Sequence, residues 1–90
     1  MIRYSILTAG KVQGVGFRFF TQLTASTLNL TGWCKNLHDG RVQIEIQGSK
    51  ETVDKFITTI KKGNNFSRID EISINSIPVI ENEKRYYIKY

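Results

Sequence analysis

Hydrophobic and polar residues alternate along five short stretches of this 90-residue chain. A period of two is typical of a strand that buries one face, so each stretch predicts a β-strand. The alternation is cleanest at residues 42–47, where valine or isoleucine occupies every second position. The predicted strands are residues 2–10, 31–37, 42–47, 72–79 and 86–90.

Three local features refine these strand predictions. The Asp39-Gly40 pair between the second and third strands is a strong signal for a tight hairpin. In the fourth strand the hydrophobic residues change parity after Asn75-Ser76, which predicts a β-bulge. Pro78 lacks a backbone N–H, and it therefore predicts that the fourth strand lies at an edge of the sheet.

Two further stretches repeat their hydrophobic residues with the spacing of a helix. The stripe at residues 53–60 is regular, and Ser49 is placed to cap its start and Gly63 to end it. A less regular stripe covers residues 17–28. The aromatic residues around this first helix are expected in the core or against the sheet, and they are Phe17, Phe19, Phe20 and Trp33.

The order of the predicted elements defines a fold class. Strand, helix, strand, strand, helix and strand form the βαββαβ ferredoxin-like sandwich of the α+β class, in which an antiparallel sheet carries both helices on one face. The fifth strand is expected as a short addition at the C-terminal end. We expect residues 1–90 to form one domain, since so short a chain fills only one modest core.

This topology brings two distant parts of the sequence together. The first and second strands are joined through a helix, so they run in the same direction. Their C-terminal ends then lie at the same edge of the sheet. We therefore expect the loop that follows Gly10 and the side chain of Asn36 to share one site.

The glycine-rich segment between the first strand and the first helix has the layout of an anion site. It reads Lys11-Val-Gln-Gly-Val-Gly-Phe-Arg18. Backbone N–H groups converge at a helix N-terminus, where the helix dipole also favours negative charge. Arg18 adds a planar fork of donors that suits a phosphate or a carboxylate. We predict that this loop holds a phosphoryl group.

Composition and charge narrow the chemistry further. The net charge of +5 comes from scattered Lys and Arg residues, which fits either a solvated basic surface or attraction of an anionic ligand. One cysteine and one histidine cannot form an intrachain disulfide or a structural zinc site. Cys34 is expected to be a small buried side chain in a strand, and His38 falls in the predicted turn.

The apolar runs also bear on location and partners. None is long enough to cross a bilayer, and residues 1–4 lack the apolar stretch of a signal peptide. We expect a cytoplasmic protein without a membrane partner. A single small domain with a paired hairpin is further expected to be a monomer.

Two stretches of the chain resemble the acylphosphatase family. The first is Gly10-Lys-Val-Gln-Gly-Val-Gly-Phe-Arg18. The second is Gly32-Trp-Cys-Lys-Asn36, followed by Asp39-Gly40-Arg-Val42 and Gly48. Both motifs occur in the family's order and at its spacing, and the ending at residues 86–90 is similar to that of many members. The resemblance covers nearly the whole chain.

The resemblance implies hydrolysis of acyl phosphates to a carboxylate and inorganic phosphate by attack of water on phosphorus. It implies no metal and no organic cofactor, with these small phosphates rather than nucleic acid as the ligands. Residues 10–16 correspond to the family's phosphate loop, Arg18 to its phosphate-binding arginine and Asn36 to the residue that positions water. Arg18 and Asn36 are the expected catalytic residues. The expected phosphate-binding residues are Gln13, Gly14, Val15, Gly16, Phe17 and Arg18.

Two other functions stay open on the sequence alone. An RNA-binding module of the RRM type has the same element order, and residues 13–20 superficially resemble its RNP1 motif. However, these residues fall in a loop and a helix start, and the third strand at residues 41–47 has no aromatic platform. A regulatory domain could keep the phosphate cradle without turnover, although the presence of both Arg18 and Asn36 argues against it.

The sequence departs from the family pattern after the second helix. Many members have Gly-Pro where this chain has Gly63-Asn64. We expect this loop to lie far from both motifs, so that the change leaves activity intact.

Overall fold

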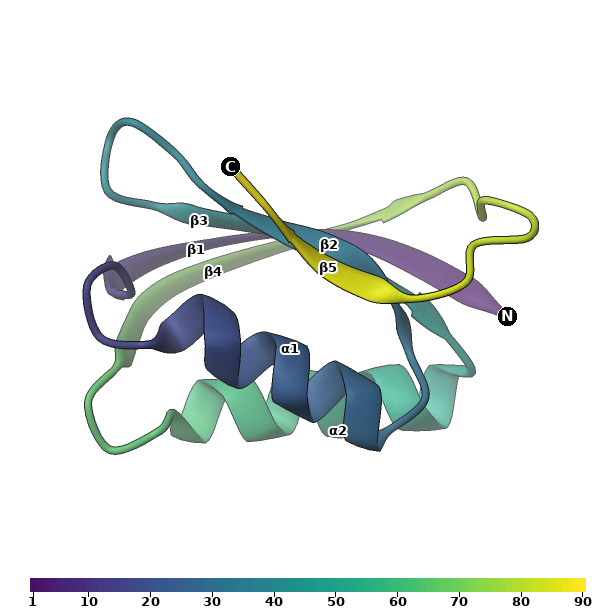
Figure 1. Cartoon of the computed structure of the whole chain (residues 1–90), viewed down its shortest axis with the longest axis horizontal. Helices are drawn as coiled ribbons and strands as arrows, with labels where there is room; N and C mark the ends of the chain where they lie inside the picture. Colours follow the sequence, from purple (N-terminus) through teal and green to yellow (C-terminus); the bar gives the residue numbers. More distant parts are fainter.

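A computed structural model describes all 90 residues and confirms the predicted order of elements (Figure 1). The strands are β1 (Ile2–Lys11), β2 (Thr31–Asn36), β3 (Val42–Gly48), β4 (Arg68–Ile77) and β5 (Tyr86–Lys89). The helices are α1 (Phe17–Thr27) and α2 (Lys50–Lys62). The fold is therefore a ferredoxin-like βαββαβ sandwich with one added strand.

The five strands form one sheet in the order β4-β1-β3-β2-β5. Every neighbouring pair is antiparallel except β2 and β5, which are parallel. The predicted antiparallel sheet is confirmed for β1 to β4, and the added strand β5 pairs with its edge in parallel. Because the chain reverses direction once between β4 and β5, the last strand runs in the direction of β1 and β2, and its pairing with β2 is parallel.

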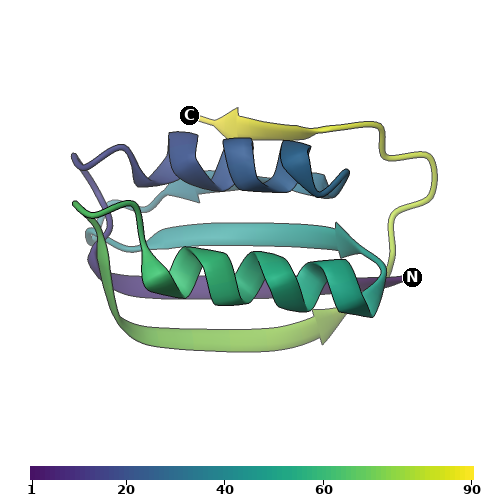
Figure 2. The same ribbon diagram turned by 90° about the horizontal axis from the view of Figure 1, so that it is seen from below.

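Both helices pack on one face of the sheet, and the other face has no helical layer (Figures 1 and 2). The core lies between these layers, where Ile6 of β1 and Ile44 of β3 are fully buried together with Phe56 of α2. Burial of such apolar surface is the main favourable term in folding. Neither helix has the length and apolar composition that crossing a bilayer requires.

The aromatic side chains of α1 differ in their burial. Phe17 is only 1% exposed and Phe20 is half-buried, whereas Phe19 is 70% exposed. The prediction that Phe19 lies in the core is therefore wrong. Successive residues of a helix are about 100° apart, so Phe19 falls on the side of α1 that is turned away from Phe17.

The edge strand β4 also corrects two details. It begins at Arg68, earlier than predicted. Its register shift lies between the pairs Gly10–Ile69 and Ala9–Glu71, where Asp70 is left unpaired, and does not follow Asn75. Gly10 permits this bulge, because its φ is +133° and a Cβ would lie 2.4 Å from the carbonyl oxygen of Arg68. The edge position is confirmed, and Pro78 follows the strand. Since β4 buries few side chains, its hydrophobic pattern reports the register poorly.

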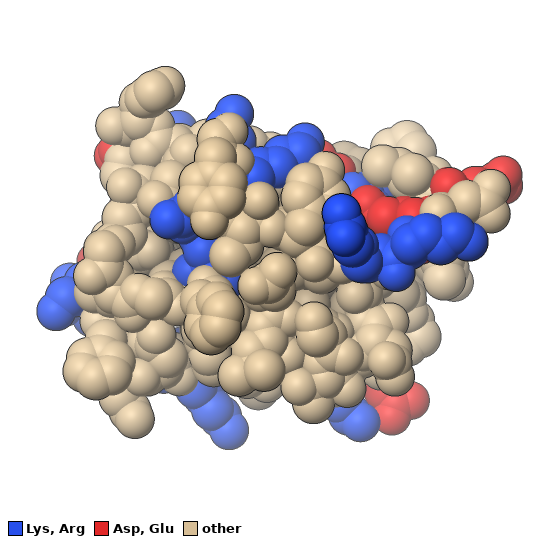
Figure 3. Space-filling model, viewed as in Figure 1, with Lys and Arg blue, Asp and Glu red and all other residues tan.

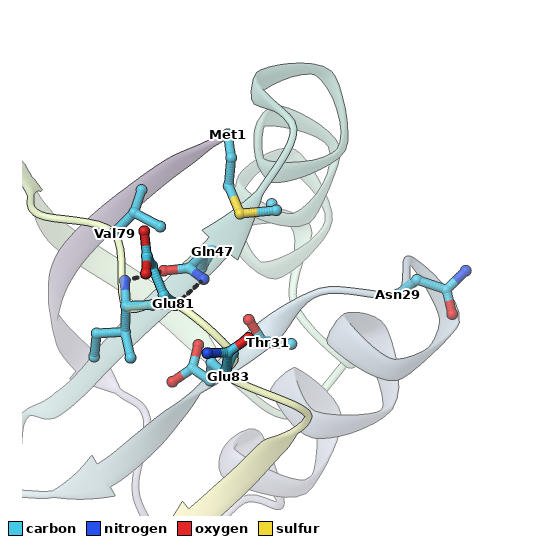
Figure 4. A pocket seen from close by; sticks show the side chains of 10 residues that line it. Met1, Asn29, Thr31, Gln47, Val79, Glu81 and Glu83 are labelled. Carbon is cyan, nitrogen blue, oxygen red and sulfur yellow. Dashed lines mark hydrogen bonds between the residues drawn. The ribbon is translucent and has the colours of Figure 1, made fainter.

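The connection between β4 and β5 closes the end of the sheet at which β1 begins (Figure 1). The Gln47 side chain accepts a hydrogen bond from the N–H of Ile80 and donates one to its carbonyl oxygen, both at 2.8 Å. A cavity of about 470 Å³ lies beside this pair, and its walls include Met1 and Glu81 (Figure 4). The candidate site lies at the opposite end of the sheet.

Candidate active site

The β1–α1 loop (residues 12–16) presents backbone donors at the start of a helix. Gly14 and Gly16 have φ of 73° and 74°, a left-handed conformation that glycine adopts with little strain. Gly16 is the N-cap of α1, and no side chain caps this helix. The N–H groups of residues 13–16 have no acceptor within the protein. These free donors therefore lie at the positive end of the α1 dipole.

The side chain of Gln13 ties this loop to the hairpin between β2 and β3. Its Nε2 donates to the carbonyl oxygens of Leu37 at 2.8 Å and Arg41 at 3.0 Å. The sequence predicted Gln13 as a phosphate-binding residue and did not indicate this side-chain contact. The observed bridge fixes the loop against the turn that follows Asn36.

Arg18 stands in the first turn of α1 without an anionic partner. It forms no salt bridge and no side-chain hydrogen bond within the protein. Its guanidinium carbon lies 5.2 Å from the centre of the Tyr90 ring, a cation–π contact. A cation at a helix N-terminus is disfavoured by the dipole unless an anion compensates it. This position therefore favours binding of an external anion.

Buried hydroxyl groups hold the backbone of this first turn. The Thr21 hydroxyl donates to the carbonyl oxygen of Arg18 at 2.7 Å and accepts a hydrogen bond from the Tyr86 hydroxyl at 3.0 Å. Cys34 packs beside them and is fully buried, as predicted. Burial raises the pKa of the Cys34 thiol and raises the pKa of Tyr86 well above its usual value. Both groups are therefore neutral near pH 7.

Asn36 ends β2 opposite Val42 of β3. Its side-chain oxygen, Oδ1, is buried and has no hydrogen-bond partner within the protein. A buried acceptor left unpaired costs about 1–3 kcal/mol, so native proteins rarely keep one without a functional reason. Asn36 therefore carries an acceptor that no group of the protein satisfies.

The structure places Arg18 and Asn36 on the walls of one hollow of about 460 Å³, beside Tyr90. A second hollow of about 230 Å³ shares Arg18 and Tyr90 and reaches the backbone of Gly14 and Gly16. The predicted meeting of the two motifs is thus present, since β1 and β2 end on either side of β3.

The side chains of Val15 and Phe17 belong to the core rather than to the site. The Val15 side chain packs against the hydrophobic core, and Phe17 is buried in it. Five of the six predicted phosphate-binding residues line one or both of the two hollows, and Val15 lines neither. Arg18 is the one charged side chain among the six.

Comparison with known proteins decides between the functions that the sequence left open. A family model described as Acylphosphatase matches residues 4–88. An acylphosphatase of Clostridium beijerinckii is 56% identical over 90 residues, which cover both chains completely. The crystal structure of acylphosphatase from Bacillus subtilis has a TM-score of 0.94 and 40% identity, and both chains are again covered completely. This chain belongs to the acylphosphatase family.

Membership of the acylphosphatase family confirms the fold and the activity class that the two motifs predicted. It also favours this activity over the RNA-binding alternative. The segment that resembles RNP1 lies in the β1–α1 loop and α1, and β3 carries no aromatic side chain. The stacking platform of an RRM is therefore missing from the strand on which it would lie.

The charges around the acylphosphatase motifs favour an anion. No aspartate or glutamate lines either hollow, whereas Lys89 joins Arg18 at the larger one. Figure 3 shows Lys and Arg atoms between uncharged side chains near the start of α1, and most of the visible acidic atoms at the other end. The site thus attracts negative charge without an internal carboxylate that competes for Arg18.

The loop after α2 is not far from the acylphosphatase motifs, contrary to the prediction. Asn64 Nδ2 donates to the carbonyl oxygen of Val15 at 2.9 Å. The reason lies in the sheet, because β4 starts opposite Lys11, at the end of β1. No local pattern indicates this contact, which joins positions 49 residues apart.

Proposed function

We propose that this chain hydrolyses acyl phosphates to a carboxylate and inorganic phosphate by attack of water on phosphorus, without a metal ion. One observation carries the proposal. Gly14 and Gly16, whose N–H groups are unpaired, line one hollow, Asn36 with its unpaired Oδ1 lines the other, and Arg18 lines both. Together they offer donors for a phosphoryl dianion and an acceptor for a water molecule.

In this proposal the phosphoryl group is held by the loop and by Arg18. The N–H groups of residues 13–17 donate to its oxygens, as expected for an anion at a helix N-terminus. The guanidinium of Arg18 makes a bidentate contact, which fixes the orientation of the group as well as its charge. Because phosphoryl transfer proceeds mainly by positioning and charge stabilisation, these contacts supply most of what the reaction needs.

The attacking water is oriented by Asn36. Its Oδ1 accepts a hydrogen bond from the water and directs a lone pair of the water oxygen toward phosphorus. A carboxamide is too weak a base to remove the proton, so the proton passes late to the phosphate itself. Orientation of all reacting partners together lowers a barrier by as much as ~7–11 kcal/mol, and Asn36 supplies a part of this.

The leaving group explains why no acid catalyst is needed. A carboxylate departs readily without prior protonation, unlike an alkoxide. The one histidine at the rim, His38, is exposed and has no hydrogen-bond partner to orient it. Catalysis in this proposal depends on Arg18, Asn36 and the backbone only.

The scale of the site supports a small substrate. Hollows of about 460 and 230 Å³ fit a phosphoryl group with a short acyl chain. We further propose that residues 1–90 act as one monomeric domain in the cytoplasm, without a nucleic-acid or membrane partner. The scattered basic charge supports the absence of a nucleic-acid partner, because it offers no continuous track for a polyanion.

Hydrolysis of acetyl phosphate in excess chelator tests the proposal. The Asn36→Ala variant should lose roughly 10²-fold in kcat, because the water is no longer oriented, while inorganic phosphate inhibits it almost as well as the wild type. The Arg18→Ala variant should lose both turnover and phosphate inhibition, since this side chain touches the anion throughout the reaction. Asn75→Ala, at an exposed position of β4, is the matched control.

Two results would contradict the proposal. A wild-type rate in Asn36→Ala would remove the role of that residue. An absence of acyl phosphate hydrolysis combined with salt-sensitive RNA binding would instead favour the RNA-binding alternative.

A further inference from the structure

Asn64 links two loops that are far apart in sequence. The turn after α2, residues 63–67, lies beside the β1–α1 loop in both ribbon views (Figures 1 and 2). The 2.9 Å bond from Asn64 Nδ2 to the carbonyl oxygen of Val15 is the one hydrogen bond between these two loops. Its position next to Gly16 makes Asn64 a neighbour of the proposed phosphate site.

The turn itself fixes which way the Asn64 amide faces. Its Oδ1 accepts hydrogen bonds from the N–H groups of Phe66 at 3.1 Å and Ser67 at 2.9 Å. Rotating the amide by 180° would place its NH₂ group against these two donors and its oxygen against the Val15 carbonyl. The observed orientation is therefore the one that satisfies all three bonds.

The bond to Val15 also determines the direction of the next N–H. In a planar trans peptide the carbonyl and the following N–H point in opposite directions. With the Val15 carbonyl held by Asn64, the N–H of Gly16 points away from Asn64. Gly16 lines the smaller hollow together with Arg18, and its N–H has no acceptor within the protein.

The Val15–Gly16 peptide has one flexible neighbour. Val15 is held by its side chain, which packs against the hydrophobic core, whereas Gly16 has a positive φ of 74°. A Cβ on Gly16 would lie 3.6 Å from Asn64 Nδ2, so Asn64 is also its nearest packing neighbour. Glycines accept either sign of φ, so the peptide could rotate and turn the Val15 oxygen toward the anion.

We infer that Asn64 is a positioning residue of the phosphate site. Its amide holds the Val15–Gly16 peptide in the orientation that offers the Gly16 N–H to a phosphoryl group. Asn64 does not touch the ligand itself and acts through this peptide. The identity of the ligand rests on the proposed function.

Asn64→Asp tests the inference with little disturbance of the turn. The carboxylate keeps an acceptor for Phe66 and Ser67, but it replaces the donor with an oxygen that repels the Val15 carbonyl. We expect the inhibition constant of inorganic phosphate to rise roughly 3–10-fold, as the loss of one hydrogen bond predicts. The KM for acetyl phosphate should rise by a similar factor.

Asn65→Asp is the matched control. It adds the same charge one residue away, at an exposed side chain that makes no hydrogen bond to the β1–α1 loop. Its phosphate inhibition constant should change less than about two-fold, because the screened charge alone acts there.

The amide NMR spectrum separates positioning from a purely structural role. In ligand-free Asn64→Asp the Gly16 resonance should move, and its response to added inorganic phosphate should shrink while that of Gly14 persists. A lower urea midpoint with an unchanged phosphate inhibition constant would assign Asn64 to stability alone and overturn the inference.

The remaining outcomes distinguish this inference from the proposed function. Wild-type phosphate inhibition and an unchanged Gly16 resonance in Asn64→Asp would overturn the inference and leave the proposed function intact. A wild-type protein that neither binds phosphate nor hydrolyses acetyl phosphate would overturn the proposed function and, with it, the role of Asn64 toward phosphate.

Discussion

Two arginines near opposite ends of β1 show how the same side chain serves different purposes. Arg3 is 1% exposed, and its guanidinium bonds Glu83 at 2.7 Å, Glu45 at 2.9 Å and Gln47 at 3.1 Å. Arg18, just past the other end of β1, has no carboxylate partner and lies under the ring of Tyr90.

The difference lies in where the compensating negative charge comes from. Burial alone would lower the pKa of Arg3, but the hydrogen bonds that its guanidinium donates to Glu83 and Glu45 outweigh burial, so the net pKa is raised. The charge of Arg3 is thus compensated within the fold, and its ion pair with Glu83 holds the β4–β5 connection against β1. Arg18 stays partly solvated, which makes an unpartnered guanidinium tolerable and leaves its donors for an external anion.

The largest expected effect is the loss of activity when Arg18 is substituted. Arg18→Lys should lower kcat/KM for acetyl phosphate by roughly 10²–10³-fold, because a point charge cannot replace the bidentate fork. Its urea midpoint should stay at the wild-type value, since no internal bond is lost. Steady-state kinetics and urea unfolding of the same preparation check both points. If Arg18→Lys kept more than a tenth of the wild-type kcat/KM, the contrast drawn between Arg3 and Arg18 would be contradicted.

The converse substitution should affect stability instead. Arg3→Met leaves Glu45 and Glu83 unpaired in a largely buried cluster, and we expect a loss of roughly 3 kcal/mol in the free energy of unfolding. Activity per folded molecule should be unchanged. Arg68→Met, which removes an exposed pair with Asp70, is the control and should have no measurable effect. Loss of turnover in folded Arg3→Met would show that the two ends of β1 are energetically coupled.

Alkaline pH tests the buried Tyr86 hydroxyl, which is hydrogen-bonded to Thr21 beneath the first turn of α1. Burial raises the folded pKa of Tyr86 well above its ordinary value near 10. The neutral phenol therefore stabilises the fold fully below pH 10, and this contribution is lost as the pH rises above 10 toward the raised pKa. The slope should reach at most about 1.4 kcal/mol per pH unit. Urea unfolding between pH 9 and 11 measures it, and Tyr86→Phe should show a shallower decline.

The smallest effect is expected at neutral pH. Tyr86→Phe removes the hydrogen bond to Thr21 and should cost about 1 kcal/mol of stability. Thr21 keeps its own hydrogen bond to the Arg18 carbonyl, so turnover should fall less than about two-fold. Kinetics and urea unfolding at pH 7 check this. A large loss of turnover would mean that the Tyr86 hydroxyl positions Arg18 directly.

The sequence predicted well those elements that have one buried face. β3 shows strict alternation because its inward residues Val42, Ile44 and Ile46 are fully buried. β4 was placed less accurately, since an exposed edge strand imposes little alternation on its residues. The parallel pairing of β5 was missed because hydrophobic periodicity defines a strand and does not identify its neighbour.

The candidate site was predictable in its two main residues for a topological reason. Arg18 follows β1 and Asn36 ends β2, and these two strands run in the same direction, so their meeting depends on element order alone. The side-chain ties of Gln13 and Asn64 were not predictable, because each joins a side chain to a backbone carbonyl in a distant loop. Such contacts depend on how loops fold, which no local pattern in the chain specifies.

Because Cys34 is buried, the rate of its alkylation reports transient opening of the structure around it. This one thiol of the chain lies against Thr21, beneath the first turn of α1, and is shielded while β2 and α1 stay packed. Alkylation in solution therefore records the moments at which this end comes apart, without any introduced label. An anion that bridges the two segments would make those moments rarer.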